Sequence, residues 1–114
     1  MLDVKYEKIS EVYALYVTID ADATGEKAVP IPFKCEVIDV IVQCRAASGG
    51  GTATLKKGST AITDAIIMAV DKVITRAGTI DDAQSSLNEG DAVSVDCANA
   101  ADRGLVTLLV RRVY

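Results

Sequence analysis

Histidine and tryptophan are absent from this sequence of 114 residues, and its aromatic residues are four tyrosines and one phenylalanine. Without histidine, the chain cannot form a Ser-His-Asp or Cys-His nucleophile, nor a zinc site of mixed cysteine and histidine ligands. Three cysteines are also too few for a zinc site of four thiolates within one chain. We therefore expect no enzymatic activity, no catalytic residue, no metal site and no cofactor.

The three cysteines, Cys35, Cys44 and Cys97, show no Cys-x-x-Cys spacing. We interpret them as buried free thiols that act as small hydrophobic side chains, in a protein that folds in a reducing cytosol. The first residues lack the basic start and apolar stretch of a signal peptide, and no apolar run reaches the length of a membrane span. A membrane partner is therefore not expected.

Basic residues are fewer than acidic ones, 12 against 16, so the formal net charge is −4. A nucleic-acid partner is not expected, because binding to phosphates needs a basic face. The basic pairs Lys56-Lys57 and Arg111-Arg112 lie in or beside segments with strand-like alternation. Paired charges in such places favour a solvated strand edge.

Three short patterns resemble parts of catalytic or binding sites, but each has a simpler interpretation. Ser59 lies near Lys57, as in a Ser-Lys nucleophile, but on a turn that would leave the lysine hydrated. The run Gly49–Gly51 lacks the Gly-Lys-Ser/Thr order and the helix of a phosphate-binding loop, so we interpret it as a hairpin loop. The acidic residues of the later loops do not have the spacing of a calcium loop, and we interpret them as solvated side chains. They are Asp81, Asp82, Glu89 and Asp91.

Branched aliphatic residues are what the sequence has in quantity, and in several segments they alternate with polar residues. A period of two predicts β-strands with one buried face. We expect such strands at 13–19, 36–46, 52–57, 72–76, 93–97 and 106–110. Loops are expected at 20–27 and 81–86, and turns at 48–51 and 99–104, whereas 61–70 fits either a short helix or a strand.

The alternation assigns each strand residue to the core or to the outer surface. In 36–46 the expected core residues are Ile38, Val40, Val42 and Cys44, and Tyr13 is expected in the core as well. Ser94 and Asp96 are expected to face outward. Tyrosine and apolar residues on an outer face are candidate contacts for another protein. The candidate interface residues are Tyr6, Tyr16, Val37, Ile41 and Leu109.

Short strands at close spacing, separated by Gly, Asp and Asn, are typical of a β-sandwich or barrel. The sequence has no βαβ alternation and no internal repeat. We therefore predict a single all-β domain over residues 1–114, with at most one short helix. Residues 1–11 are mixed and charged, and they fit a short helix or an extended arm. Such an arm, with Tyr6 on it, would dock either on a neighbouring subunit or on its own domain.

Several strand and turn motifs lie between Glu36 and Val113. They are Val37-Ile38-Asp39-Val40, Thr52-Ala53-Thr54-Leu55-Lys56-Lys57-Gly58, Ala61-Ile62-Thr63-Asp64, Leu87-Asn88-Glu89-Gly90-Asp91-Ala92-Val93-Ser94-Val95 and Arg103-Gly104-Leu105-Val106-Thr107. In this order they resemble the small β-sandwich virion proteins of tailed bacteriophages, which are head-decoration (cement) or fibre-type proteins.

The resemblance implies an antiparallel β-sandwich with a jelly-roll-like fold. It also implies a viral structural protein that folds in the host cytoplasm and is located in the virion, at the capsid surface. The implied partners are the major capsid protein and further copies of this chain, in a homo-oligomer that is most often a homotrimer. The alternative is a tail or head fibre, or a receptor-binding module for carbohydrate. Sugar sites usually stack a ring on an exposed aromatic residue, and tryptophan is absent.

Overall fold

The computed structural model describes residues 12–20, 23–46, 49–69, 72–101 and 103–113. In this part of the chain every regular element is a β-strand, and no helix occurs. The strands are β1 (Val12–Ile19), β2 (Ala23–Val29), β3 (Cys35–Cys44), β4 (Thr52–Lys57), β5 (Thr60–Ala61), β6 (Ile66–Ile67), β7 (Ile74–Arg76), β8 (Ser86–Leu87), β9 (Val93–Ala101) and β10 (Gly104–Arg112).

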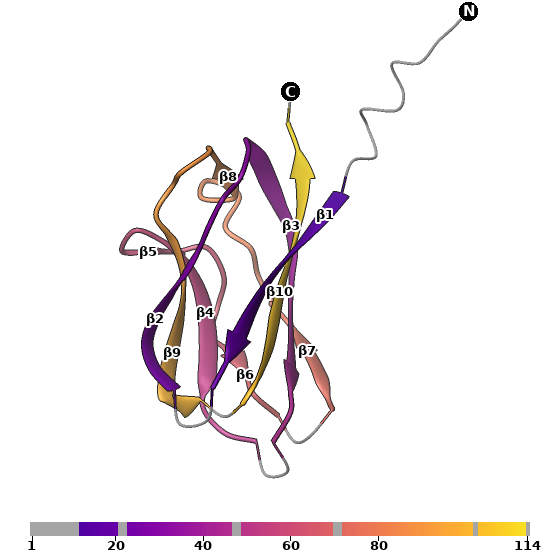
Figure 1. Ribbon diagram of the computed structural model, residues 1–114, viewed down its shortest axis with the longest axis vertical. Coiled ribbons are helices and arrows are strands. Elements are labelled where there is room, and N and C mark those ends of the chain that lie inside the picture. The colour runs from indigo at the N-terminus through magenta and orange to yellow at the C-terminus, as the bar shows by residue number, and fades with distance from the viewer. Residues whose placement is uncertain (1–11, 21–22, 47–48, 70–71, 102, 114) are drawn as a thin grey trace, which may run out of the picture.

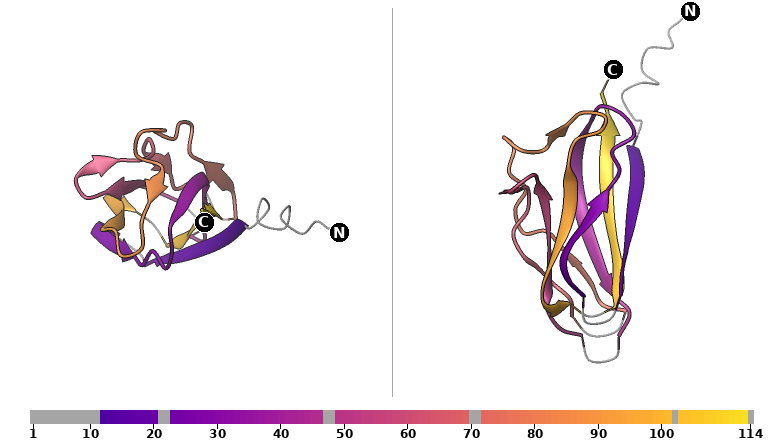
Figure 2. Two further views of the ribbon diagram at one scale, coloured as in Figure 1. Left: turned by 90° about the horizontal axis from the view of Figure 1, so that it is seen from above. Right: turned by 60° about the vertical axis from the view of Figure 1, so that its left-hand side comes forward.

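The strands form two antiparallel sheets that pack face to face (Figure 1). We call the sheet with the strand order β1-β10-β3-β7 sheet A, and in it β8 also pairs with β3. Sheet B has the strand order β2-β9-β4-β5, and β6 also pairs with β4. Figure 2 shows the same two layers from above and from the side. The arrangement confirms the predicted antiparallel β-sandwich.

The path of the chain through the two sheets is that of a jelly roll. The chain crosses to the other sheet between β1 and β2, between β2 and β3, between β3 and β4, and again between β9 and β10. As a result, β1 pairs with β10, and β2 pairs with β9 in the opposite sheet. Nested antiparallel pairs of distant strands, divided between two sheets, define the jelly roll. The jelly-roll-like fold that the resemblance implies is therefore the observed one.

The connections at Gly49–Gly51 and at 99–104 do not close hairpins. Each joins a strand of one sheet to a strand of the other, because β3 and β10 lie in sheet A whereas β4 and β9 lie in sheet B. All three glycines of the first connection have positive φ. A Cβ atom on Gly49 would also lie only 2.4 Å from the carbonyl oxygen of Ala69. At 49–51 the chain turns as predicted, but the hairpin interpretation is wrong. The turn predicted at 99–104 is wrong for most of its length, because β9 extends to Ala101 and β10 begins at Gly104.

Strand β2 occupies most of the segment 20–27, so the predicted loop is wrong there. β2 lies at the edge of sheet B and pairs only with β9 in the described chain. Its register with β9 shifts between Ala23 and Gly25, where β9 has more residues than β2, and Gly25 has a φ of 88°. Polar and charged residues are common on such edges. They hide the period of two from which a strand is predicted.

The segment 61–70, for which a helix and a strand both remain open from sequence, contains no helix in its described residues, 61–69. It contains the end of β5 and the whole of β6. The side chains of Ile62, Ile66 and Met68 are buried, and Ile67 faces solvent. The β-branched isoleucines favour this extended form.

The core fills the space between the two sheets, and every second residue of the long strands points into it. Full burial of one Val, Leu or Ile side chain stabilises the fold by about 1.5–3 kcal/mol. The buried set includes Val17, Ile19, Val40, Val42, Cys44, Ala53, Leu55, Val93, Val95, Cys97, Val106, Leu108 and Val110. The alternation therefore predicts the core correctly along most of these strands.

A β-bulge at Ile38 reverses the two faces at the start of β3. In the register between β3 and β10, Val37 lies opposite Val110. Asp39 lies opposite Leu109, the neighbour of Val110, so Ile38 is an extra residue in β3. Val37 consequently points into the core and is 4% exposed, and Ile38 is only half-buried. The prediction of an outer Val37 and a core Ile38 is wrong, because the bulge shifts the alternation by one residue.

Tyr13 is 37% exposed and does not lie in the core, contrary to prediction. It is at the start of the edge strand β1, where only one neighbouring strand covers it. The Tyr13 ring instead packs against Phe33, with the ring centroids 4.8 Å apart. The guanidinium carbon of Arg112 lies 4.6 Å from the centroid of Phe33. These side chains cover the end of the sandwich at which β1 begins.

Candidate interaction surface

The outer face of sheet A carries a row of apolar side chains on four neighbouring strands. Tyr16 of β1 lies opposite Thr107 of β10, and Thr107 lies opposite Ile41 of β3. Since opposite residues of an antiparallel pair point to the same side, these three side chains form one row across the sheet. In the rows on either side, Leu109 lies between Ala14 and Asp39, and Leu105 lies between Thr18 and Gln43, so each of these rows has a polar residue on β3. We call this surface the apolar face, and it consists of Val12, Ala14, Tyr16, Thr18, Ile41, Ile74, Leu105, Thr107 and Leu109.

Three of the five candidate interface residues lie together on the apolar face. Tyr16 is 65% exposed, and Ile41 and Leu109 are half-buried between their neighbours on the sheet. Val37 lies in the core, so it cannot contact a partner of the folded domain. Tyr6 lies outside the described residues. The structure thus brings together the candidates of β1, β3 and β10.

Leu105 and Ile74 belong to the apolar face but are missing from the predicted set. Leu105 lies opposite Thr18 on one side and Gln43 on the other. Ile74 lies opposite Gln43 and is 56% exposed. The signal for Leu105 is present in the sequence, since it shares the outward parity of Thr107 and Leu109. Ile74 is harder to find, because a strand of three residues has hardly any alternation to read.

The charged residues at the margins of the apolar face form ion pairs with one another. Arg76 of β7 pairs with Asp39 of β3. Arg111 of β10 pairs with Glu36 of β3, at 3.6 Å between Nη1 and Oε1. Exposed pairs of this kind add little to stability. They matter here because both carboxylates on this face have a basic partner. A second protein that docks on the face would therefore not bury an unpaired negative charge.

The outer face of sheet B is mainly polar, although Ile67 of β6 lies opposite Thr52 and is 64% exposed there. Lys56 forms an ion pair with Asp96 at 3.3 Å, and the Ser94 hydroxyl donates a hydrogen bond to Glu26 Oε1 at 2.6 Å. These neighbours cover Ser94, which is 8% exposed, so its predicted outward side chain is not solvent-exposed. Lys56 lies on a strand with neighbours on both sides, and the edge position expected for Lys56 is wrong. The two outer faces therefore differ in chemical character.

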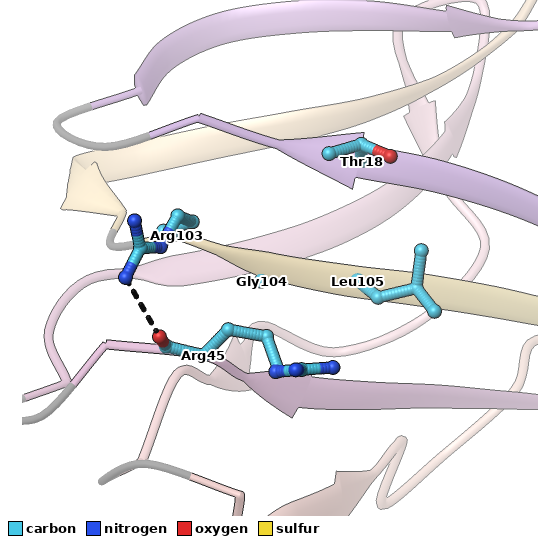
Figure 3. A pocket seen from close by; sticks show the side chains of 5 residues that line it. All are labelled: Thr18, Arg45, Arg103, Gly104 and Leu105. Carbon is cyan, nitrogen blue, oxygen red and sulfur yellow. Dashed lines mark hydrogen bonds between the residues drawn. The ribbon is translucent and has the colours of Figure 1, made fainter.

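A pocket of about 360 Å³ lies at the end of the apolar face where β10 begins. It is lined by Thr18, Arg45, Arg103, Gly104 and Leu105. A guanidinium nitrogen of Arg103 donates a hydrogen bond to the carbonyl oxygen of Arg45 at 3.2 Å. Figure 3 shows that the Arg45 side chain runs the other way, along β3, so the two guanidinium groups do not point toward one another. The pocket therefore contains no convergent pair of cations.

The three cysteines are buried free thiols, as predicted. Burial raises the pKa of the Cys35 thiol, and the negative charge of Asp91 raises it further. Burial is also the main reason why the pKa of Cys97 is raised. Because the thiolate is the reactive form, both groups are poor nucleophiles near neutral pH.

Several of the side chains that resemble catalytic or metal-binding groups have structural partners. Lys57 Nζ donates a hydrogen bond to the carbonyl oxygen of Ser86 and forms an ion pair with Asp91. Asp81 accepts a hydrogen bond from the backbone N–H of Ala83. Among the described residues, no group of three or more His, Cys, Asp or Glu side chains could hold a metal ion. In the same part of the chain, no helix is both long enough and apolar enough to cross a membrane.

The apolar face is thus the surface of this domain best suited to contact a partner. Comparison of the chain with family models, with curated proteins and with solved structures finds no match.

Proposed function

We propose that this chain is a structural virion protein, a capsid decoration subunit that binds the outer face of a phage head through the apolar face. The observation that carries the proposal is the gathering of exposed apolar side chains on one face of a rigid sheet, opposite a mainly polar face. The jelly-roll fold is used in viral capsid domains and in lectins. That use supports the proposal only by analogy, since a fold does not determine a function.

The arrangement of the apolar face suits a contact between proteins. Interfaces typically have an apolar centre, an enrichment in tyrosine and a polar rim. Here Tyr16, Ile41 and Leu109 supply the centre, and the Arg76–Asp39 and Arg111–Glu36 pairs lie at the margin. A stable contact buries about 800 Å² on each partner. The strands β1, β3 and β10, which carry most of the face, are long and paired, so docking needs no ordering of their backbone.

The proposed partners are the major capsid protein and further copies of the chain. In this role the protein works by binding, needs no cofactor and interacts with neither nucleic acid nor membrane. It folds in the host cytoplasm before it joins the capsid surface, and buried reduced thiols suit that compartment. The trimer that the resemblance implies stays a prediction.

Co-sedimentation with capsids tests this proposal. Capsids are assembled from the major capsid protein encoded in the same genome, mixed with the purified chain and pelleted. The wild-type chain is expected in the pellet. Ile74→Lys, which places a charge on the apolar face, is expected to stay in the supernatant. Ala28→Lys, which makes a similar change at an exposed position on the outer face of sheet B, is the matched control and should pellet like the wild type.

Two outcomes of this experiment would contradict the proposal. A wild-type chain that never pellets with these capsids contradicts the decoration role. Equal losses for Ile74→Lys and Ala28→Lys would show that the apolar face is not the contact surface.

A carbohydrate-binding role, as in a fibre or receptor-binding module, is favoured by one observation. The ring of Tyr16 is largely exposed on an open sheet face, where a sugar ring could stack on it. A glycan array with the wild-type chain tests this role, and Tyr16→Ala is the matched variant. Binding that disappears in Tyr16→Ala would support it, and an array without signal would exclude it.

A further inference from the structure

Most edge strands of this sandwich are protected against pairing with another chain. An edge strand exposes unpaired N–H and C=O groups, and proteins limit this hazard with charges, bulges or very short strands. At one edge of sheet B, the pairing of β2 with β9 is irregular next to Gly25, and β2 has two charged residues, Glu26 and Lys27. At the other edge, β5 and β6 have two residues each. The β7 and β8 edge of sheet A is similarly short, with three and two residues.

The edge formed by β1 has none of these protections. β1 is eight residues long, and its sequence, VYALYVTI, contains no charge, no proline and no glycine. It is paired along its whole length with β10 and with no other strand of the described chain. In the right-hand view of Figure 2, β1 forms the right-hand margin of the sandwich. A long, regular and uncharged edge strand is a ready partner for another strand.

The inner side of β1 is also incompletely covered. Leu15 points toward the core and lies opposite the fully buried Leu108, but Leu15 itself remains half-buried. Its neighbour on the same side, Val17, is buried at 8% exposure. A strand added next to β1 would cover Leu15, because neighbouring strands lie about 4.8 Å apart.

From these observations we propose that two copies of the chain pair through β1, antiparallel across a two-fold axis, so that the two A sheets become one continuous sheet. We assign the second copy as the partner because a two-fold axis places β1 beside β1 of that copy. Since β1 has no charged residue, the two strands do not repel one another. Pairing uses up both β1 edges, and the remaining edges are protected. The assembly therefore closes at two copies and does not grow into a fibre.

The side chains restrict the register of this pairing. Outward residues must lie opposite outward residues. The two-fold axis therefore passes between one residue of β1 and the same residue of the second copy, not at the level of a peptide bond between two successive residues. With the axis at Tyr16, Tyr16 lies opposite Tyr16 of the second copy, and Leu15 lies opposite its Val17. This register gives an aromatic cross-strand pair on the outer face and covers Leu15 on the inner face.

This inference goes beyond the proposed function and does not depend on it, since self-pairing needs no capsid. It also differs from the trimer that the resemblance implies. A dimer that fails to bind capsids would overturn the decoration role alone. A capsid-binding monomer would overturn the β1 pairing alone.

Cysteine cross-linking tests the register. Opposite residues of paired antiparallel strands have Cα atoms about 4.5–5.5 Å apart, within the range of a disulfide. Tyr16→Cys is therefore expected to form a covalent dimer under mild oxidation. Ile74→Cys is the matched control: it replaces a similarly exposed residue of the same face, but on the far edge of sheet A. It should cross-link only at the background rate of colliding molecules.

Light scattering on a sizing column tests the pairing without cross-links. Wild type and Ile74→Lys are expected at twice the chain mass of 12.0 kDa, and Tyr16→Lys at the single-chain mass, because two opposed ammonium groups repel. A circular dichroism spectrum checks that each variant is folded. A monomeric wild type, a dimer that persists in Tyr16→Lys, or equal cross-linking of Tyr16→Cys and Ile74→Cys would each overturn the proposal.

Discussion

Gly104 lies so close to Met68 that a Cβ atom at position 104 would be 2.6 Å from the Met68 Cε atom. The same Cβ atom would be 2.6 Å from the carbonyl oxygen of Gln43 on the neighbouring strand. Gly104, the first residue of β10, is thus packed tightly between β3 and the segment that follows β6. Glycine is needed here for space, since its φ is not in the positive range.

Gly104→Ala is expected to lower the free energy of unfolding by about 1–3 kcal/mol, the usual cost of an overpacked core. Urea denaturation measures it. Gly104→Ala should cost a similar amount when it is introduced into Met68→Ala, because the Gln43 carbonyl oxygen still cannot move out of the way. Thr18→Ala, at an exposed position of the same pocket, is the control and should change stability by less than about 0.5 kcal/mol. If Gly104→Ala cost nothing in the Met68→Ala background, Met68 alone would limit the space.

The bulge at Ile38 can be tested by comparing Val37 with Ile41. Val37→Thr places a hydroxyl in the core and should cost about 1–3 kcal/mol. Ile41→Thr makes a similar change on the outer face and should cost less than about 1 kcal/mol, because the hydroxyl there can reach water. Thermal unfolding of the two variants gives the comparison. Equal losses would mean that Val37 and Ile41 share one face and that β3 has no bulge. A larger loss for Ile41→Thr would contradict the outer position of Ile41.

The buried thiols predict how stability changes at alkaline pH. The pKa values of Cys35 and Cys97 are raised above 9.0 in the folded chain, so these thiols keep their protons there when the unfolded chain has begun to lose them. The folded state then binds more protons than the unfolded state, and stability falls as the pH rises above about 9. Urea midpoints at about pH 8 and about pH 10 measure this fall. The fall should be smaller in a Cys35→Ala, Cys97→Ala double variant, and an unchanged pH dependence would contradict the assignment.

The aromatic cluster at the end of the sandwich should contribute modestly to stability. Phe33→Leu keeps an apolar side chain but removes the ring that contacts both Tyr13 and Arg112. Aromatic pairs contribute about 0.5–1.5 kcal/mol beyond their buried area, and an exposed cation–π contact about 0.5–1 kcal/mol. A loss of about 1–2 kcal/mol is therefore expected in chemical denaturation. Arg112→Met should account for the smaller share, and a Phe33→Leu variant as stable as wild type would show that the cluster only covers the surface.

The period of two predicts this fold well wherever a strand has one core face and one outer face. It finds β3, β4, β9 and β10 because burial forces their alternation. It misses β2, because the polar and charged residues of this edge strand hide the alternation. It also misassigns Val37, because the bulge shifts the register of the backbone and leaves no recognisable signal in the sequence. These two errors come from an edge strand and from a bulge.

The apolar face shows a different limit. Tyr16, Ile41 and Leu109 can each be assigned to an outer surface from parity alone. That they form one surface depends on β10 lying between β1 and β3, and strand order depends on contacts between distant parts of the chain. Alternation along one strand carries no information on which strand lies beside it.

The position of β10 has a consequence for how the protein is made. β1 and β3 are not hydrogen-bonded to one another. Each pairs with β10, which is synthesised after both, although β3 also pairs with β7 and β8. While the ribosome is still adding the last strand, sheet A has a vacant central place and β1 has no partner at all. Distant pairings of this kind form slowly, over milliseconds to seconds. Sheet A can therefore close only once β10 has been synthesised, because β10 pairs with both β1 and β3.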